Sequence, residues 1–194
     1  MRERDGRGSW QLSMSEELEI LKIVTERLSQ GHFEYMISGS MAANYYTIPR
    51  MTRDIDIVIE LSNFNLTQFV GLFKKDFFID EDLIREEVPR KGMFNIIHRD
   101  YAIKIDFILH KGTEFQASSF ERKRDVRIGD ISISIITPED LILAKMLWAK
   151  DSYSDLQLND IRNIMKTVEN LDQKYINAWV EKLDLQPVYE KARA

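Results

Sequence analysis

Cysteine is absent from the 194-residue chain, so neither a disulfide framework nor a thiolate metal site can form. No apolar run approaches the ~18 residues of a membrane-spanning helix. The polar segment 1–13 lacks the apolar core of a signal peptide. These absences predict a protein of the reducing cytoplasm with no membrane segment. The net charge of −5 indicates that the surface as a whole does not attract nucleic acid.

Strand-like segments dominate the middle of the chain and helical segments its end, which predicts an α/β fold with a small mixed sheet backed by helices. We expect residues 1–13 to be a disordered or vector-derived tail and residues 14–136 to form the core. A threonine cap, a proline and two acids in Thr137–Asp140 predict the start of a helix. Residues 137–194 are therefore expected to form a C-terminal helical subdomain.

Two aspartates mark a strand predicted over residues 54–59. Side chains alternate along a strand, so its isoleucines share one face while Asp54 and Asp56 share the other. Aspartate is disfavoured in strands, so two of them need a reason. One alternative is an edge strand whose charges are solvated. The other is a site that uses both carboxylates.

A third aspartate follows the same pattern in a strand predicted over residues 102–109. Asp106 falls on its polar face together with Lys104, opposite an apolar face. If the two strands are neighbours, Asp106 lies beside Asp54 and Asp56, and a cation is needed to relieve their repulsion. Carboxylate oxygens suit magnesium, and manganese is the alternative. Asp54, Asp56 and Asp106 are thus the predicted metal ligands and catalytic residues.

A strand predicted at residues 35–38 turns through Gly39 and Ser40 into a short helix. Such a turn directs backbone N–H groups and the positive end of the helix toward one point, which favours binding of phosphate. Pro49 ends the helix. Arg53 lies just before the carboxylates and would bind phosphate or pair with an exposed acid.

Gly-Ser, a short helix, Asp-x-Asp and a later strand aspartate together resemble the nucleotidyltransferase superfamily, which has a DNA polymerase beta-like fold. The stretch Arg50–Asp56 and the Thr137–Leu141 helix start are similar to a small bacterial branch that includes AbiEii-type toxins. The resemblance covers about residues 35–165. It implies nucleotide-binding roles for Lys145 and Asp160. The alternatives are a lysine at the edge of an apolar helix face and a solvated helix charge.

The resemblance implies a magnesium-dependent enzyme that moves a nucleoside monophosphate from an NTP to an acceptor hydroxyl and releases pyrophosphate. Two alternatives stay open. The chain would be a toxin–antitoxin component that modifies tRNA or a partner protein, or a degenerate member that binds a nucleotide or protein without transfer. The basic run Arg122–Arg124 is either a solvated strand edge or a groove for RNA. Assembly into a homo-oligomer also stays open.

Overall fold

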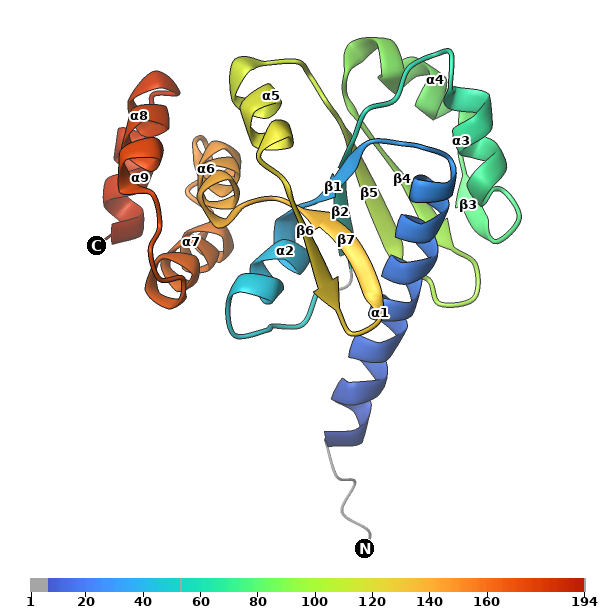
Figure 1. The fold of residues 1–194 in the computed structure, drawn as a ribbon, viewed down its shortest axis with the longest axis horizontal. Helices are drawn as coiled ribbons and strands as arrows, with labels where there is room; N and C mark the ends of the chain where they lie inside the picture. The colour runs from blue at the N-terminus through green and yellow to red at the C-terminus, as the bar shows by residue number, and fades with distance from the viewer. Residues whose placement is uncertain (1–6, 53, 194) are drawn as a thin grey trace, which may run out of the picture. The chain divides into compact units, whose positions relative to one another are not determined.

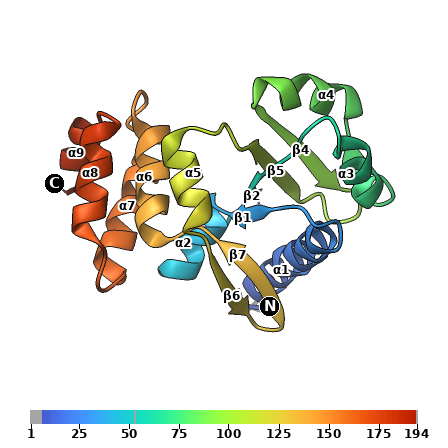
Figure 2. The ribbon, with the colours of Figure 1, turned by 45° about the horizontal axis from the view of Figure 1, so that its top comes forward.

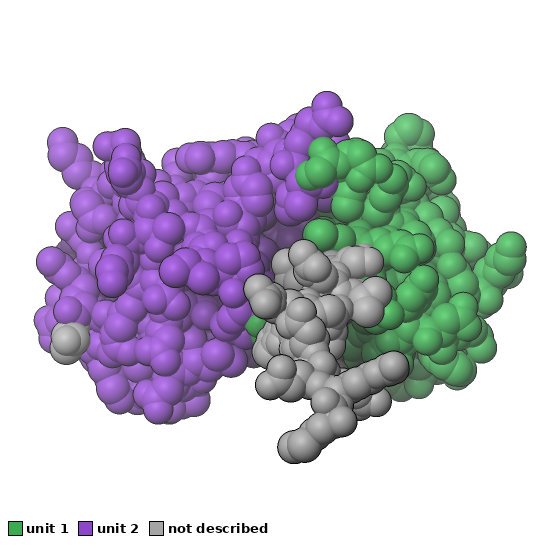
Figure 3. All heavy atoms as spheres, turned by 90° about the horizontal axis from the view of Figure 1, so that it is seen from below, with its two compact units in different colours: residues 1–35, 51–111, 129–131 green, residues 36–50, 112–128, 132–194 purple. Residues whose placement is uncertain are grey.

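The computed structural model describes residues 7–52 and 54–193, with side chains from residue 16 onward (Figure 1). The described chain divides into two compact units, each built from separate stretches of sequence, which Figure 3 colours green and purple. Unit 1 holds residues up to 35, 51–111 and 129–131. Unit 2 holds residues 36–50, 112–128 and 132 onward, so the predicted boundary at residue 137 falls inside it.

Unit 1 contains a mixed group of four strands in the order β3-β4-β5-β2. Its strands are β2 (Asp54–Ile59), β3 (Phe77–Ile79), β4 (Met93–His98) and β5 (Lys104–Leu109). The β3–β4 and β4–β5 pairs are antiparallel, whereas β2 and β5 run parallel. The strands predicted over residues 54–59 and 102–109 are therefore present as β2 and β5, and they are neighbours as the carboxylate pattern required.

Helices α1 (Arg7–Gln30), α3 (Leu66–Phe73) and α4 (Glu81–Arg90) complete unit 1. Phe69 and Phe73 of α3 pack their rings against Phe107 of β5, with centroids 5.1 and 6.2 Å away. Helix α3 therefore covers the apolar face of β2 and β5, the face opposite the aspartates. Arg27 of α1 joins this layer through a bidentate pair with Asp76, with N–O distances of 2.7 and 2.6 Å.

Unit 2 carries three strands and six helices among its described residues. The strands lie in the order β1-β7-β6, with bounds Tyr35–Ile37, Ile131–Ile135 and Arg124–Ile128. The helices are α2 (Gly39–Tyr46), α5 (Glu114–Glu121), α6 (Pro138–Ala149), α7 (Asp155–Thr167), α8 (Gln173–Lys182) and α9 (Gln186–Arg193). Figure 2 shows α6 to α9 gathered at the C-terminal part of the chain. Helix α2 contacts α6 and α7.

Two segments differ from the sequence-based expectations. Helix α1 begins at Arg7, so part of the segment assigned to a tail is helical, while residues 1–6 lie outside the described part of the chain. No residue between Trp10 and Ser13 opposes a helix, which allows the helix to begin before residue 14. Helix α9 was not predicted, although Val188, Tyr189 and Ala192 form a buried stripe along it.

Candidate active site

The predicted carboxylates stand in a row on one face of β2 and β5. In the parallel register, Asp56 lies directly opposite Asp106, and Asp54 lies opposite Lys104. Ile55, Ile57 and Phe107 point to the other face and are fully buried. Neighbouring strands are about 4.8 Å apart, so the side chains of Asp56 and Asp106 are close neighbours. The strand periodicity thus brings these residues together as predicted.

Lys104 lies within this row and contacts two of its acids. The Lys104 ammonium is 2.7 Å from Oδ2 of Asp106 and 3.5 Å from Oδ2 of Asp54. The hydrogen bond that Lys104 donates to Asp106 raises the pKa of Lys104 despite the opposing effect of burial. The side chain of Asp106 is only 14% exposed, so its charge is partly removed from water. The ammonium therefore balances one of the three negative charges of the row in this structure.

The donor chemistry of the row fits a divalent cation, because all three acids offer hard carboxylate oxygens. Asp54 and Asp106 already converge on one positively charged atom. Even so, within residues 7–52 and 54–193 no three His, Cys, Asp or Glu side chains gather closely enough to hold a metal ion. The two observations together describe a carboxylate pair arranged around a lysine.

Strand β2 is an interior strand of the sheet, so the alternative is wrong about an edge strand, whereas the Asp54 side chain is 52% exposed and its charge is solvated. Strand β5 pairs with β2 along its whole length. On the other side, the N–H of Glu60 donates to the carbonyl of Glu34 over 3.0 Å. Within unit 1, the two aspartates therefore lie on an interior strand.

In unit 2, β1 leads through Ser38 directly into α2. Gly39 is the first residue of this helix and has a φ of 58°, a conformation that glycine adopts without strain. The first N–H groups of a helix have no partner inside it, and they carry the positive end of its dipole. The predicted phosphate-binding turn is therefore present as a strand, a positive-φ glycine and a helix N-terminus.

Arg50 contacts this turn from the segment that follows α2. The Nη2 of Arg50 donates to the Ser40 hydroxyl over 2.7 Å. The backbone of Arg50 is held at two points by the Asn44 side chain, which donates to its carbonyl over 2.8 Å and accepts from its N–H over 3.0 Å. The guanidinium thus reaches Ser40 from a fixed backbone position.

Asp160 of α7 joins Arg50 to Lys145 of α6. Arg50 donates to both oxygens of Asp160, over 3.1 and 3.0 Å, and Lys145 donates to Oδ2 over 2.8 Å. Lys145 also donates to the side chain of Gln157 over 3.1 Å. Lys145 and Asp160 are 3% and 4% exposed, so the alternatives of a lysine at a helix edge and a solvated acid are both wrong.

The two cations control the charge of Asp160. Burial raises the pKa of this carboxyl, but hydrogen bonds from Arg50 and Lys145 outweigh burial and leave the pKa below its ordinary value. Asp160 is therefore held ionised, and it fixes both cations in return. Of the other predicted residues, Arg53 lies outside the described part of the chain.

The basic run predicted as a strand edge or RNA groove is partly used inside unit 2. Arg122 donates to the fully buried Asp140 over 3.0 Å, and its guanidinium lies 3.9 Å from the ring centre of Tyr175. Tyr175 donates to the same carboxylate over 2.6 Å. Burial and this hydrogen bond raise the pKa of Tyr175 to about 12. Arg122 therefore stabilises the contact of α5 with α6 and α8.

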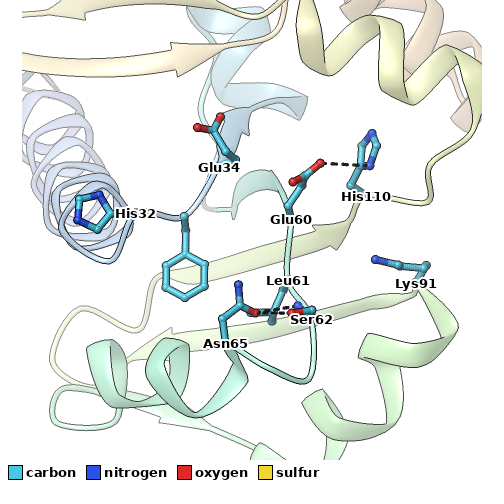
Figure 4. Close-up of a pocket in the computed structure, with 9 residues that line it drawn as sticks. His32, Glu34, Glu60, Leu61, Ser62, Asn65, Lys91 and His110 are labelled. Carbon is cyan, nitrogen blue, oxygen red and sulfur yellow. Dashed lines mark hydrogen bonds and ion pairs between the residues drawn. The ribbon is translucent and has the colours of Figure 1, made fainter.

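A cavity of about 350 Å³ lies elsewhere in unit 1, where β2 and β5 end (Figure 4). Its polar lining includes Glu34, Glu60 and His110, and His110 lies 3.9 Å from Glu60. Asp54 and Glu60 are separated by the length of β2, which at about 3.3 Å per residue is roughly 20 Å. None of the predicted residues lines this cavity. We centre the candidate site on the carboxylate row because its charges converge on one cation.

Two residues that contact predicted site residues, one in each unit, were not themselves predicted as site residues. Arg50 was noted only as part of a family-like stretch, and its partner Asp160 lies 110 positions away. Lys104 was placed on the face of Asp106, but its contact with Asp54 depends on the register of β2 and β5. A signal was present in the second case, since a lysine and an aspartate two residues apart share a strand face.

Comparisons by sequence give no relative, since no protein-family model and no curated protein matches the chain. Comparison of the structure with solved structures does find similar folds. An antigenic nucleotidyltransferase-like protein from Paracoccidioides brasiliensis matches with a TM-score of 0.54 and 18% identity, covering 92% of each chain.

Two further solved structures have similar folds. The factor ANT(2'')-Ia matches with a TM-score of 0.60 and 11% identity, over 94% of this chain and 100% of its own. The lincosamide adenylyltransferase LnuA, solved with lincomycin bound, matches with a TM-score of 0.50 and 14% identity, over 79% of this chain and 97% of its own. The chain therefore has the fold of nucleotidyltransferase structures, which confirms the predicted α/β fold.

The part of the chain that the structure describes contains no helix that combines the length and the apolar character needed to cross a membrane. The resemblance to AbiEii-type toxins is tested by none of these findings and stays a prediction.

Proposed function

We propose that this chain is a nucleotidyltransferase that moves a nucleoside monophosphate from an NTP to an acceptor hydroxyl. The observation that carries the proposal is the carboxylate row, in which Asp56 lies opposite Asp106 on interior strands. The fold shared with nucleotidyltransferase structures supports it. Clustered aspartates on a sheet face repel one another, and the single ammonium of Lys104 balances only one of the three charges, so a purely structural role is a poor explanation.

Asp54, Asp56 and Asp106 would hold magnesium or manganese in this reaction. The bound metal would neutralise charge on the reacting phosphate and on the departing pyrophosphate. Of the two acids that contact Lys104, Asp106 is the less exposed, with 14% of its side chain accessible against 52% for Asp54. We assign Asp106 the further role of general base, because it lies directly opposite Asp56 in the row and so beside the reacting groups.

The residues around the N-terminus of α2 would bind the phosphates. Gly39 lets a phosphate approach the backbone, and the Ser40 hydroxyl and the N–H groups at the start of α2 would donate to its oxygens. Lys145 would supply a positive charge, and Asp160 would hold it in position over 2.8 Å. We keep Arg53 as a further phosphate contact on its place in the sequence.

The chemistry balances with these groups alone. Asp106 accepts the proton of the acceptor hydroxyl, and the oxygen forms a bond to the α-phosphorus of the NTP. The bond from that phosphorus to the bridging oxygen breaks, and pyrophosphate leaves. Positioning and charge stabilisation supply most of the rate in such transfers.

The acceptor class is open to experiment, and the predicted classes are tRNA and a partner protein. Antibiotics enter as a third class, because a similar structure, ANT(2'')-Ia, was solved with adenylyl-2''-tobramycin. We place the activity in the cytoplasm, as the absence of cysteine favours.

The test is incubation of the chain with each NTP, magnesium and one acceptor pool at a time: total RNA, lysate protein or a set of hydroxyl-bearing antibiotics. Two labels on the NTP separate the outcomes. Label at the α-phosphate should pass to one pool while label at the γ-phosphate leaves with pyrophosphate. Transfer of the γ-label would reveal a kinase instead, and no transfer to any pool would contradict the proposal.

A further inference from the structure

Lys104 is a positively charged residue that lies among the acids of the carboxylate row. It lies opposite Asp54 in the register of β2 and β5, and it precedes Asp106 by two residues, so all three side chains share one face. The ammonium contacts Asp106 over 2.7 Å and Asp54 over 3.5 Å. Two of the proposed metal ligands are therefore already arranged around a cation that belongs to the chain.

The ammonium and a divalent metal cannot occupy this place together. Magnesium binds carboxylate oxygens at about 2.0–2.1 Å. The Asp106 oxygen that contacts Lys104 would then lie between two cations only a few ångströms apart, and their repulsion would be strong at a partly buried site. Binding of metal at Asp54 and Asp106 therefore requires that the ammonium move away.

The side chain of Lys104 is able to make this movement. It is 37% exposed and its amine ends a flexible chain of four methylene groups. The lysine thus has a clear role when metal is absent, since its charge offsets the repulsion between Asp54 and Asp106.

We propose that Lys104 is a built-in counter-ion of the metal site, which holds Asp54 and Asp106 together until a divalent cation displaces it. The inference rests on the proposed function, because it takes these acids as metal ligands. It goes further by making metal binding a competition with an ammonium of the same chain. The apparent affinity for metal is then set partly by Lys104.

The first test measures binding of Mn²⁺ to the full chain without nucleotide, from the electron paramagnetic resonance signal of the free ion. Lys104→Met removes the competing charge and keeps the length of the side chain, so it should bind Mn²⁺ roughly three- to tenfold more tightly than the wild type. Lys104→Arg retains the charge and should stay close to the wild type. Lys75→Met, at an exposed lysine of unit 1, is the matched control and should change nothing.

Unchanged or weaker binding of Mn²⁺ by Lys104→Met would overturn the inference, because the lysine would then have no effect on metal binding or would assist it. Absence of Mn²⁺ binding in both wild type and Lys104→Met would overturn the metal role on which the proposed function also depends. A failure of the inference alone and a failure of both are therefore distinguishable.

The second test needs no variant, so it holds even if Lys104→Met does not fold. Reductive methylation of the wild-type chain, followed by mass spectrometry, reports how accessible each lysine amine is. Magnesium should increase the labelling of Lys104 several-fold relative to that of Lys75. Equal labelling of Lys104 with and without magnesium would overturn the displacement.

Discussion

Arg50 and Asp160 form a two-point ion pair across 110 positions of sequence, with Nε 3.1 Å from Oδ1 and Nη2 3.0 Å from Oδ2. The same guanidinium donates to the Ser40 hydroxyl at the start of α2. Asp160 on α7 therefore helps to position the Arg50 guanidinium beside the proposed phosphate-binding turn. Within unit 2, helices α6 and α7 hold the Arg50 guanidinium and the Lys145 ammonium around one carboxylate.

Asp160→Asn should lower the free energy of unfolding by about 3 kcal/mol, because it leaves two cations without their shared carboxylate. Denaturant unfolding followed by circular dichroism measures this loss. Asp151→Asn removes an exposed aspartate from the turn before α7 and should change stability little. Equal stability of the two variants would contradict the assigned role of Asp160.

The pH dependence of the same variants follows from the lowered pKa of Asp160 in the folded chain. A lowered pKa gives stability that is fully present above the unfolded value and is lost as pH falls through the folded value. The difference between wild type and Asp160→Asn should therefore be constant from about pH 7 to about pH 5 and shrink below about pH 4. Unfolding measured over this range would contradict the account if the difference grew toward low pH.

Tyr175→Phe tests the network around Asp140, which we regard as structural. The change removes a 2.6 Å hydrogen bond to a fully buried carboxylate and should cost about 1–2 kcal/mol of stability. The partly exposed Tyr153 offers a control in Tyr153→Phe, which should be close to neutral. Nucleotidyl transfer by folded Tyr175→Phe should equal that of the wild type. A loss of transfer without a loss of folding would show that the network around Asp140 contributes to the reaction and is not only structural.

Nucleotide binding should depend on the divalent cation. A ligand that binds only the folded chain stabilises it by mass action, and at a hundred times its Kd it should raise the Tm by about 5 °C or more. The accepted NTP should therefore raise the Tm in magnesium or manganese and leave it unchanged in EDTA. An equal shift in EDTA would show that the carboxylates do not act through metal.

The sequence was most informative where the pattern was local. Alternation in β2 and β5 predicted both apolar faces and placed all three aspartates on the opposite face, because strand geometry fixes where successive side chains point. The start of α6 was equally clear, since Thr137 caps the helix by accepting from the N–H of Asp140.

Contacts between distant residues were the part that the sequence did not reveal. The pair of Arg50 with Asp160 depends on how α2 and α7 pack, and the contact of Lys104 with Asp54 depends on strand register. Helix α9 was missed for two reasons. Proline usually argues against a helix, but Pro187 lies near the start of α9, where proline is tolerated. In addition, the eight residues of α9 give only a short apolar stripe.

Transfer of an α-phosphate label by wild type and by Asp56→Asn is the most direct test of the proposed reaction. The variant keeps the shape of the side chain and removes one charge from the row, so its fold should persist and its stability should hold or rise. The account predicts that the wild type labels an acceptor pool in magnesium and that Asp56→Asn does not. Equal labelling by the two folded proteins would contradict the central role of the carboxylate row.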